Sequence, residues 1–201
     1  QQSPQPLAVF GPQQVGKTTT IQYWAKSHFF HCIYMNFDTQ PDYKLCFQQL
    51  DPKIICQKIE NLFHCHLNAS KIILICDGMD CFFRGMIGIK LIKERYPHLH
   101  IILTGKYRYF GHPHKYFKTL TTCYMGPMTF IEVLKNTRHA YLVDELEYFD
   151  LHHPLSQDTH ATCLSLVQDY IETGGLPHII AKLHHLSQSG PVEDSFDHYY
   201  E

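Results

Sequence analysis

The sequence predicts an α/β fold: a five-stranded, mainly parallel sheet flanked by helices, with a small helical C-terminal subdomain. In the first part of the chain, short apolar runs alternate with segments of helical periodicity, a pattern typical of a parallel sheet with right-handed crossovers. From about residue 128 onward only helical periodicity remains. We therefore expect an α/β core over residues 1–127, a helical lid or subdomain over residues 128–190 and a tail over residues 191–201.

Runs rich in apolar and β-branched residues supply the five expected strands, which lie at residues 7–10, 31–38, 72–77, 101–104 and 121–125. The third run is apolar up to its last residue, as in strands that helices cover on both faces. Helices are expected after each of the first three runs and throughout the C-terminal part. Their apolar faces are marked by Ile21 and Ala25, by Ile55 and Ile59, by Met86 and Ile89, and by Leu164, Val167 and Ile171.

The composition excludes several classes of protein. With 201 residues, 44% of them hydrophobic, the chain is long enough to bury the core of an α/β domain. Its formal net charge of −2 gives no electrostatic argument for a nucleic-acid partner or an anionic membrane surface. No apolar run approaches the roughly 20 residues of a membrane span.

The cysteines and the start of the chain bear on its location. We interpret the eight cysteines as reduced, because no C-x-x-C occurs and Cys32, Cys76 and Cys123 fall in apolar runs that are expected to bury them. The sixteen histidines show no zinc-site spacing. The chain begins at Gln1 without a basic, apolar leader, so we expect a cytoplasmic protein without a signal peptide. A first residue other than Met leaves open that the chain is a segment of a longer one.

The most specific motif is Gly-Pro-Gln-Gln-Val-Gly-Lys-Thr at residues 11–18, which matches G-x-x-x-x-G-K-[ST]. It follows an expected strand and precedes an expected helix, the context in which this motif forms a phosphate-binding P-loop. We expect Lys17 to reach the β- and γ-phosphates and the Thr18 hydroxyl to ligate Mg²⁺. The expected nucleotide-binding residues are Gly11, Pro12, Gln13, Gln14, Val15, Gly16, Lys17, Thr18 and Thr19. The sequence thus predicts a P-loop NTPase.

A second element is the apolar strand that ends at Asp77, as in a Walker B motif. We expect Asp77 to meet the Mg²⁺ shell opposite Thr18, although Asp-Gly is also a common turn dipeptide. ATPases of the additional-strand type usually place a water-activating Glu after this Asp, but Gly78 follows it here. Hydrolysis is therefore expected to be slow and to rise in a Gly78→Glu variant, unless Asp80 supplies the carboxylate.

A third element is Thr104, the polar end of the next strand. Such a residue commonly lies between the γ-phosphate and the attacking water, although a Thr before Gly is also an ordinary strand end. The Tyr-, His- and Gly-rich stretch over residues 106–118 has no periodicity, and we expect a mobile loop near the nucleotide. Lys106 and Arg108 are its candidate phosphate contacts, and a plain surface loop is the alternative.

Six motifs follow one another along the chain: G-P-Q-Q-V-G-K-T-T at 11–19, Y-M-N-F-D at 34–38, the strand ending at Asp77, L-T-G at 103–105, G-P-M-T-F-I-E at 126–132 and G-G-L-P at 174–177. In this order they resemble the motifs of prokaryotic AAA-type ATPases of the "AAA domain 14" group. The resemblance spans about residues 7–182. It implies an ATPase domain that binds ATP with Mg²⁺.

The chain also departs from this group. Where the group has D-E-I-Q, this chain has Asp77-Gly78-Met79-Asp80, and where the group has T-G-S, it has Thr104-Gly105-Lys106. The Gly-Arg that the group carries before the last strand is replaced near Phe117-Lys118. The Walker B motif is therefore degenerate. Members of the group usually continue into a winged-helix and nuclease-like region, which we expect to be absent here. The resemblance thus implies ATP and ADP as ligands and a protein partner, for which that region is a candidate.

Three interpretations of function remain. The first is an ATPase that couples hydrolysis to a conformational change, and the second is a nucleotide-binding switch that does not hydrolyse, which the missing Glu favours. The third, a small-molecule P-loop kinase, needs a basic lid, whereas the arginines are scattered at Arg84, Arg95, Arg108 and Arg138. The absence of N-K-x-D argues against a GTPase, so ATP is the expected nucleotide.

Overall fold

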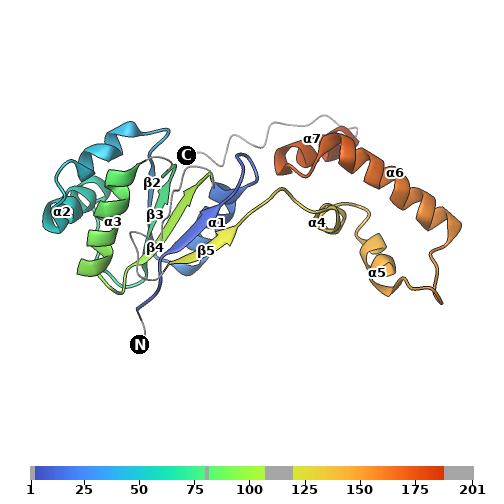
Figure 1. Cartoon of the computed structure of the whole chain (residues 1–201), viewed down its shortest axis with the longest axis horizontal. Coiled ribbons are helices and arrows are strands. Elements are labelled where there is room, and N and C mark those ends of the chain that lie inside the picture. Colours follow the sequence, from blue (N-terminus) through green and yellow to red (C-terminus); the bar gives the residue numbers. More distant parts are fainter. Residues whose placement is uncertain (1–2, 80–81, 107–119, 188–201) are drawn as a thin grey trace. The chain divides into compact units, whose positions relative to one another are not determined.

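The structure is a computed structural model that describes residues 3–79, 82–106 and 120–187 (Figure 1). It divides into two compact units, Gln1–Gly126 and Pro127–Glu201. None of the helices in the described ranges has both the length and the apolar character needed to cross a membrane. In chain order the elements are β1 (Leu7–Phe10), α1 (Lys17–His28), β2 (His31–Asn36), the 3-10 helix η1 (Pro41–Phe47), α2 (Pro52–Phe63), β3 (Ile72–Asp77), α3 (Phe83–Arg95), β4 (His100–Gly105), β5 (Thr121–Tyr124), α4 (Phe130–Lys135), α5 (Tyr141–Tyr148), α6 (Gln157–Thr173) and α7 (Pro177–Ser187).

The first unit contains a five-stranded sheet in the order β2-β3-β4-β1-β5. Every pairing between neighbouring strands is parallel. The register places Asn36 opposite Asp77 and Val9 opposite Thr104, so the carboxyl ends of β1 to β4 meet at one edge of the sheet. The expected α/β fold with a parallel five-stranded sheet is confirmed.

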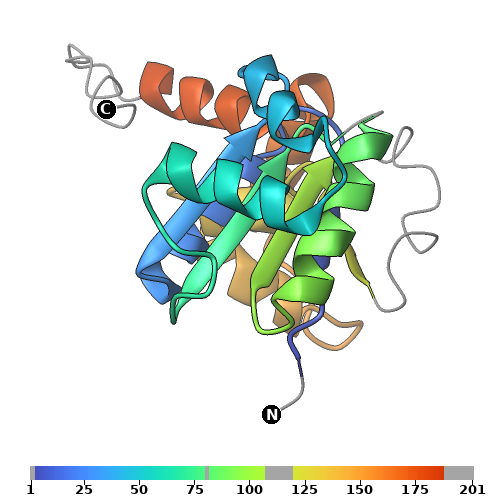
Figure 2. The same ribbon diagram turned by 90° about the vertical axis from the view of Figure 1, so that its left-hand side faces the viewer.

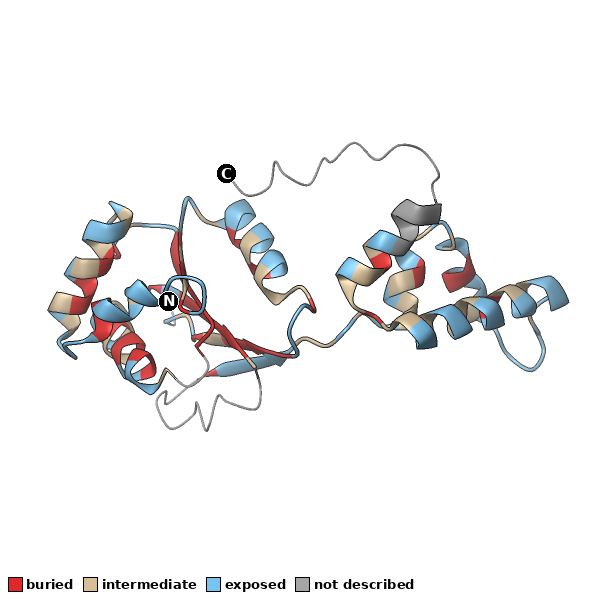
Figure 3. Cartoon of the chain, turned by 90° about the horizontal axis from the view of Figure 1, so that it is seen from above, coloured by how far each residue is buried: buried red, intermediate tan, exposed pale blue. Residues whose placement is uncertain are grey.

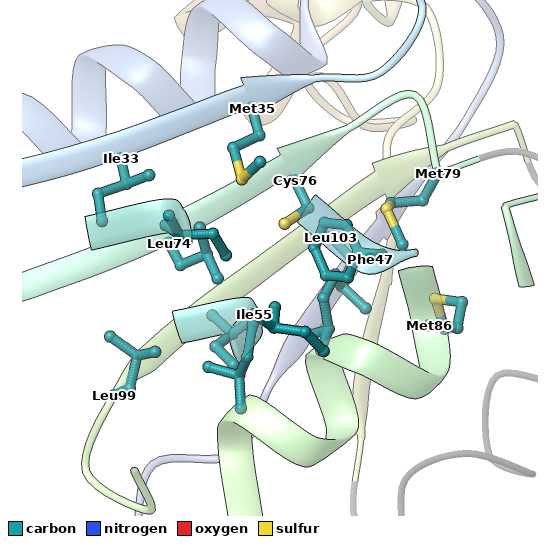
Figure 4. Close-up of a cluster of buried hydrophobic side chains, with 14 of the residues drawn as sticks. Ile33, Met35, Phe47, Ile55, Leu74, Cys76, Met79, Met86, Leu99 and Leu103 are labelled. Atoms are coloured by element: carbon teal, nitrogen blue, oxygen red, sulfur yellow. The ribbon is translucent and has the colours of Figure 1, made fainter. Parts of the chain in front are cut away.

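Helices cover the two faces of this sheet unequally. Figure 2 shows α2 and α3 lying across one face. Under them lies the larger core, to which β2, β3 and β4 contribute Ile33, Met35, Leu74, Cys76 and Leu103, and η1, α2 and α3 contribute Phe47, Ile55, Ile59, Met86 and Ile89 (Figure 4). On the other face, α1 packs Ile21 and Ala25 against Val9, Ile73, Ile75 and Ile102. The central strand β3 is buried along its whole length, as its continuous apolar run predicts.

The two edge strands differ from the expectation for buried runs. Cys76 on β3 is buried, but Cys32 on β2 and Cys123 on β5 are exposed, so the expected burial of these two thiols was wrong. Every residue of β5 is exposed, and Figure 3 shows this strand in pale blue beside the red central strands. The cause is topological, since an edge strand has one neighbour and an apolar run in the sequence does not reveal which strands are edges.

The second unit is a small helical cluster with its own core of Leu134, Leu142, Val143 and Cys163. Helix α4 starts at a capping box in which Thr129 and Glu132 satisfy each other's backbone amides. The expected apolar face of α6 is not buried as a whole: Leu164 and Ile171 are 58% and 74% exposed. Gly175 is required by close packing, because a Cβ there would lie 2.0 Å from the Met128 carbonyl oxygen.

Candidate nucleotide-binding site

The loop over residues 11–16 joins β1 to the start of α1 at Lys17. Val15 points into the protein and is 1% exposed, which anchors the loop. Gln14 and Gly16 have positive φ angles of 64° and 93°. Gly11 cannot carry a side chain, because a Cβ would lie 1.9 Å from the Met125 carbonyl oxygen. The two motif glycines therefore permit a tight turn that ends at the amide groups of a helix N-terminus, where anions bind.

Lys17 is held over this loop. Its Nζ donates to the carbonyl oxygens of Gly11 and Pro12 at 3.0 and 2.6 Å. These bonds place a positive charge beside the loop amides. Pro12, Gln13 and Gln14 are exposed, as is Thr19 in the first turn of α1, while Gly11 and Val15 are buried.

The Thr18 and Asp77 side chains meet beside the loop. The Thr18 hydroxyl donates to Asp77 Oδ2 at 2.6 Å, although 59 residues separate the two in sequence. Asp77 is the last residue of β3 and is 9% exposed. The structure thus brings together the two residues that the sequence assigns to Mg²⁺.

Thr104 contacts the same carboxylate. It is fully buried near the end of β4, and its hydroxyl donates to Asp77 Oδ1. Its expected position beside the γ-phosphate stays a prediction, since the hydrogen bond in this structure goes to Asp77. The strand ends are also joined through the backbone, because Met79 N donates to the Thr104 carbonyl at 3.1 Å.

Tyr34 is a third donor to Asp77, and the sequence did not identify it. Its hydroxyl donates to Asp77 Oδ2 at 2.8 Å and accepts from Asn36 Nδ2 at 3.1 Å. Partial burial and the hydrogen bond to Asp77 raise the pKa of Tyr34 to about 12, so this hydroxyl keeps its proton at neutral pH. The sequence does place Tyr34 and Asn36 on one face of β2. It does not show that β2 pairs with β3, and the contact between Tyr34 and Asp77 depends on that pairing.

Asp38 lies against Gly78, the residue that stands in place of the family's Glu. A Cβ at Gly78 would lie 2.7 Å from Asp38 Cγ and 2.8 Å from Oδ2. Gly78 also has a φ of +70°, a conformation that side chains rarely adopt. The carboxylate of Asp38 therefore fills the space in which a side chain at position 78 would begin.

Two of the expected site elements, together with the expected tail over residues 191–201, fall outside the part of the chain that the structure describes. Asp80, the alternative carboxylate, is one. The other is the loop over residues 106–118, of which only Lys106 at its start is described. Arg108 therefore has no structural assignment here.

The donor set fits Mg²⁺. A hydroxyl and a carboxylate are the hard oxygen ligands that this ion prefers, and Asp77 and Thr18 already lie within hydrogen-bond distance of each other. Thr18 and Asp77 would hold the ion, which would neutralise charge on the phosphates of a bound nucleotide. In the described part of the chain, no group of three or more His, Cys, Asp or Glu side chains forms another candidate metal site.

Comparisons with known proteins agree with this geometry. The sequence matches the AAA domain family AAA_14 over residues 3–134. No curated protein matches the chain. Among solved structures, that of C. elegans PCH-2 is similar in fold, with a TM-score of 0.53 and 14% sequence identity. The similarity covers 94% of this chain and 56% of that one, so the chain spans little more than half the length of PCH-2.

The family match includes the P-loop, the strand that ends at Asp77 and Thr104. It therefore covers the whole set of described polar residues that meet beside the loop. Families of this kind bind nucleotides through these elements, which supports nucleotide binding of the ATPase type. The chain belongs to the AAA domain family and contains its P-loop ATPase domain.

Proposed function

We propose that this chain binds ATP with Mg²⁺ through residues 11–19, Asp77 and Thr104, hydrolyses it slowly and couples this cycle to a conformational change. The observation that carries the proposal is the hydrogen bond between Thr18 and Asp77, because it brings together the Walker A and Walker B side chains needed at one Mg²⁺. Lys17 supplies the positive charge at the same loop.

A nucleotide-binding switch without hydrolysis is the second candidate. Gly78 favours it, since glycine cannot activate water, its φ of +70° is one that side chains rarely adopt, and a side chain there would have to displace Asp38. A P-loop kinase is less well supported, because it needs arginines that reach the transferred phosphoryl group. The Arg84 guanidinium instead donates to the carbonyl oxygens of Phe47 and Gln48.

Titration of the chain with Mg-ATP, followed by phosphate release from the same sample, tests the proposal. Binding with slow release supports the ATPase, and binding without release supports the switch. Turnover that depends on an added phosphoryl acceptor indicates a kinase. Absence of binding contradicts all three.

The cellular context is part of the proposal. We place the chain in the cytoplasm, where ATP and Mg²⁺ are available and its thiols stay reduced. ADP is the expected product, and a protein partner would respond to the nucleotide state. Pull-down with ATP and with ADP would reveal such a partner through a difference between the two states.

A further inference from the structure

Asp38 lies where the site lacks a carboxylate. The described residues at the ends of β2, β3 and β4 bring several side chains toward the P-loop, and position 78 contributes none. Asp38 Cγ is 2.7 Å from the point where a Cβ of residue 78 would stand. The space that a side chain at position 78 would fill is thus occupied by the carboxylate of Asp38, two residues after the end of β2.

Backbone hydrogen bonds fix this placement. Phe37 N donates to the Asp77 carbonyl at 3.0 Å, which extends the pairing of β2 with β3 by one residue. Asn36 Oδ1 accepts from the backbone amides of Asp38 and Thr39 at 2.9 and 3.0 Å. This Asx turn folds the chain directly after Asn36 and holds Asp38 at the edge of the sheet. The position of Asp38 is therefore set by β2 itself.

The environment of Asp38 suits a group that accepts a proton from a water molecule. The residue is exposed, whereas Asp77 is buried and accepts hydrogen bonds from Thr18, Tyr34 and Thr104. The two carboxylates thus have different surroundings. The oxygens of Asp77 already accept hydrogen bonds from three hydroxyl groups, while Asp38 is exposed to solvent at the same end of the sheet.

We infer that Asp38 is the catalytic base of this domain and takes over the role of the missing Glu at position 78. The inference rests on the proposed ATPase function. The Asp38 carboxylate accepts a proton from a water molecule whose oxygen attacks the γ-phosphorus of ATP. The bond between that phosphorus and the β–γ bridging oxygen breaks, ADP and inorganic phosphate leave, and the proton passes from Asp38 to solvent.

Asp38→Asn tests the inference, because it keeps the shape of the side chain and removes the base. Phosphate release under saturating Mg-ATP should fall by about 10²–10⁴-fold. Two binding measurements accompany it. Affinity for Mg-ATPγS should stay within about twofold of the unchanged chain, while affinity for Mg-ADP with aluminium fluoride, which mimics the attacked phosphoryl group, should weaken about tenfold or more.

Asp42→Asn is the matched control, since Asp42 is an exposed carboxylate four residues away in η1 and should leave all three measurements unchanged. Equal phosphate release from Asp38→Asn and Asp42→Asn overturns the inference, as does a loss confined to Asp80→Asn. A chain that binds Mg-ATPγS without releasing phosphate from ATP overturns the inference and leaves the switch. A chain that binds no nucleotide overturns the proposed function as well.

Discussion

The Thr18 hydroxyl donates to Asp77 Oδ2 at 2.6 Å, and this bond connects the first turn of α1 with the last residue of β3. Because β4 separates β1 from β3 in the sheet, the contact links the helix that follows β1 to a strand with which β1 does not pair. A cation coordinated by both oxygens would take the place of this hydrogen bond as the link between the two side chains. The same two side chains thus organise the free site and would organise the loaded one.

We expect Lys17→Ala to weaken ATP binding by about tenfold or more, because it removes the charge beside the phosphate-binding amides. Isothermal titration with Mg-ATP measures the loss. Lys26→Ala is the control, since Lys26 is an exposed lysine in the last turn of the same helix. Equal affinities in Lys17→Ala and Lys26→Ala would contradict the assignment of the P-loop.

Thr18→Val should make ATP binding nearly independent of Mg²⁺. Valine keeps the shape of the side chain but removes the hydroxyl that now donates to Asp77. Titrations with Mg²⁺ and with EDTA measure the dependence in each protein. Thr20→Val serves as the control, because Thr20 is exposed on the same helix. If Thr18→Val keeps the Mg²⁺ dependence of the unchanged chain, Thr18 is not a metal ligand.

The sequence predicted the parts of the site that depend on local patterns. The P-loop follows from its motif, and Asp77 and Thr104 follow from apolar runs that end in a polar residue. Tyr34 and Asp38 could not be assigned in this way. Their relation to Asp77 and Gly78 depends on the pairing of β2 with β3, and strand order is a tertiary property that no local pattern contains.

The same limit explains the errors in burial. Cys32 and Cys123 lie in apolar runs but on edge strands, where one neighbour is missing. Leu164 and Ile171 share a helical face with Val167, yet α6 packs with the adjacent face that carries Cys163, Leu166 and Tyr170. Periodicity identifies faces that can be buried, and the neighbouring elements decide which of them is.

The stability of the first unit should depend on pH through Tyr34. Its pKa is raised from 10.0 to about 12 in the folded chain, so the protonated hydroxyl stabilises the fold below pH 10 and this contribution is lost as the pH rises toward 12. Urea unfolding of the unchanged chain and of Tyr34→Phe checks this. The unchanged chain should lose stability relative to the variant between pH 10 and 12, whereas a constant difference across that range would contradict the raised pKa.

Finally, the structure changes the expected outcome of Gly78→Glu. The sequence alone suggests that restoring the Glu raises hydrolysis. However, Gly78 has a φ of +70°, and a Cβ there would lie 2.7 Å from Asp38 Cγ. The left-handed backbone alone costs about 1–2 kcal/mol for a residue with a side chain. We therefore expect Gly78→Glu to destabilise the first unit and to displace Asp38, so that phosphate release falls instead of rising.

The two costs can be separated with alanine variants. Gly78→Ala should destabilise the first unit both through the positive φ of this residue and through the collision with Asp38. In an Asp38→Gly background the cost of Gly78→Ala should fall, since only the backbone cost remains. If the cost of Gly78→Ala is the same with and without Asp38, the carboxylate does not occupy this space, and Gly78→Glu should then raise turnover as the sequence suggests.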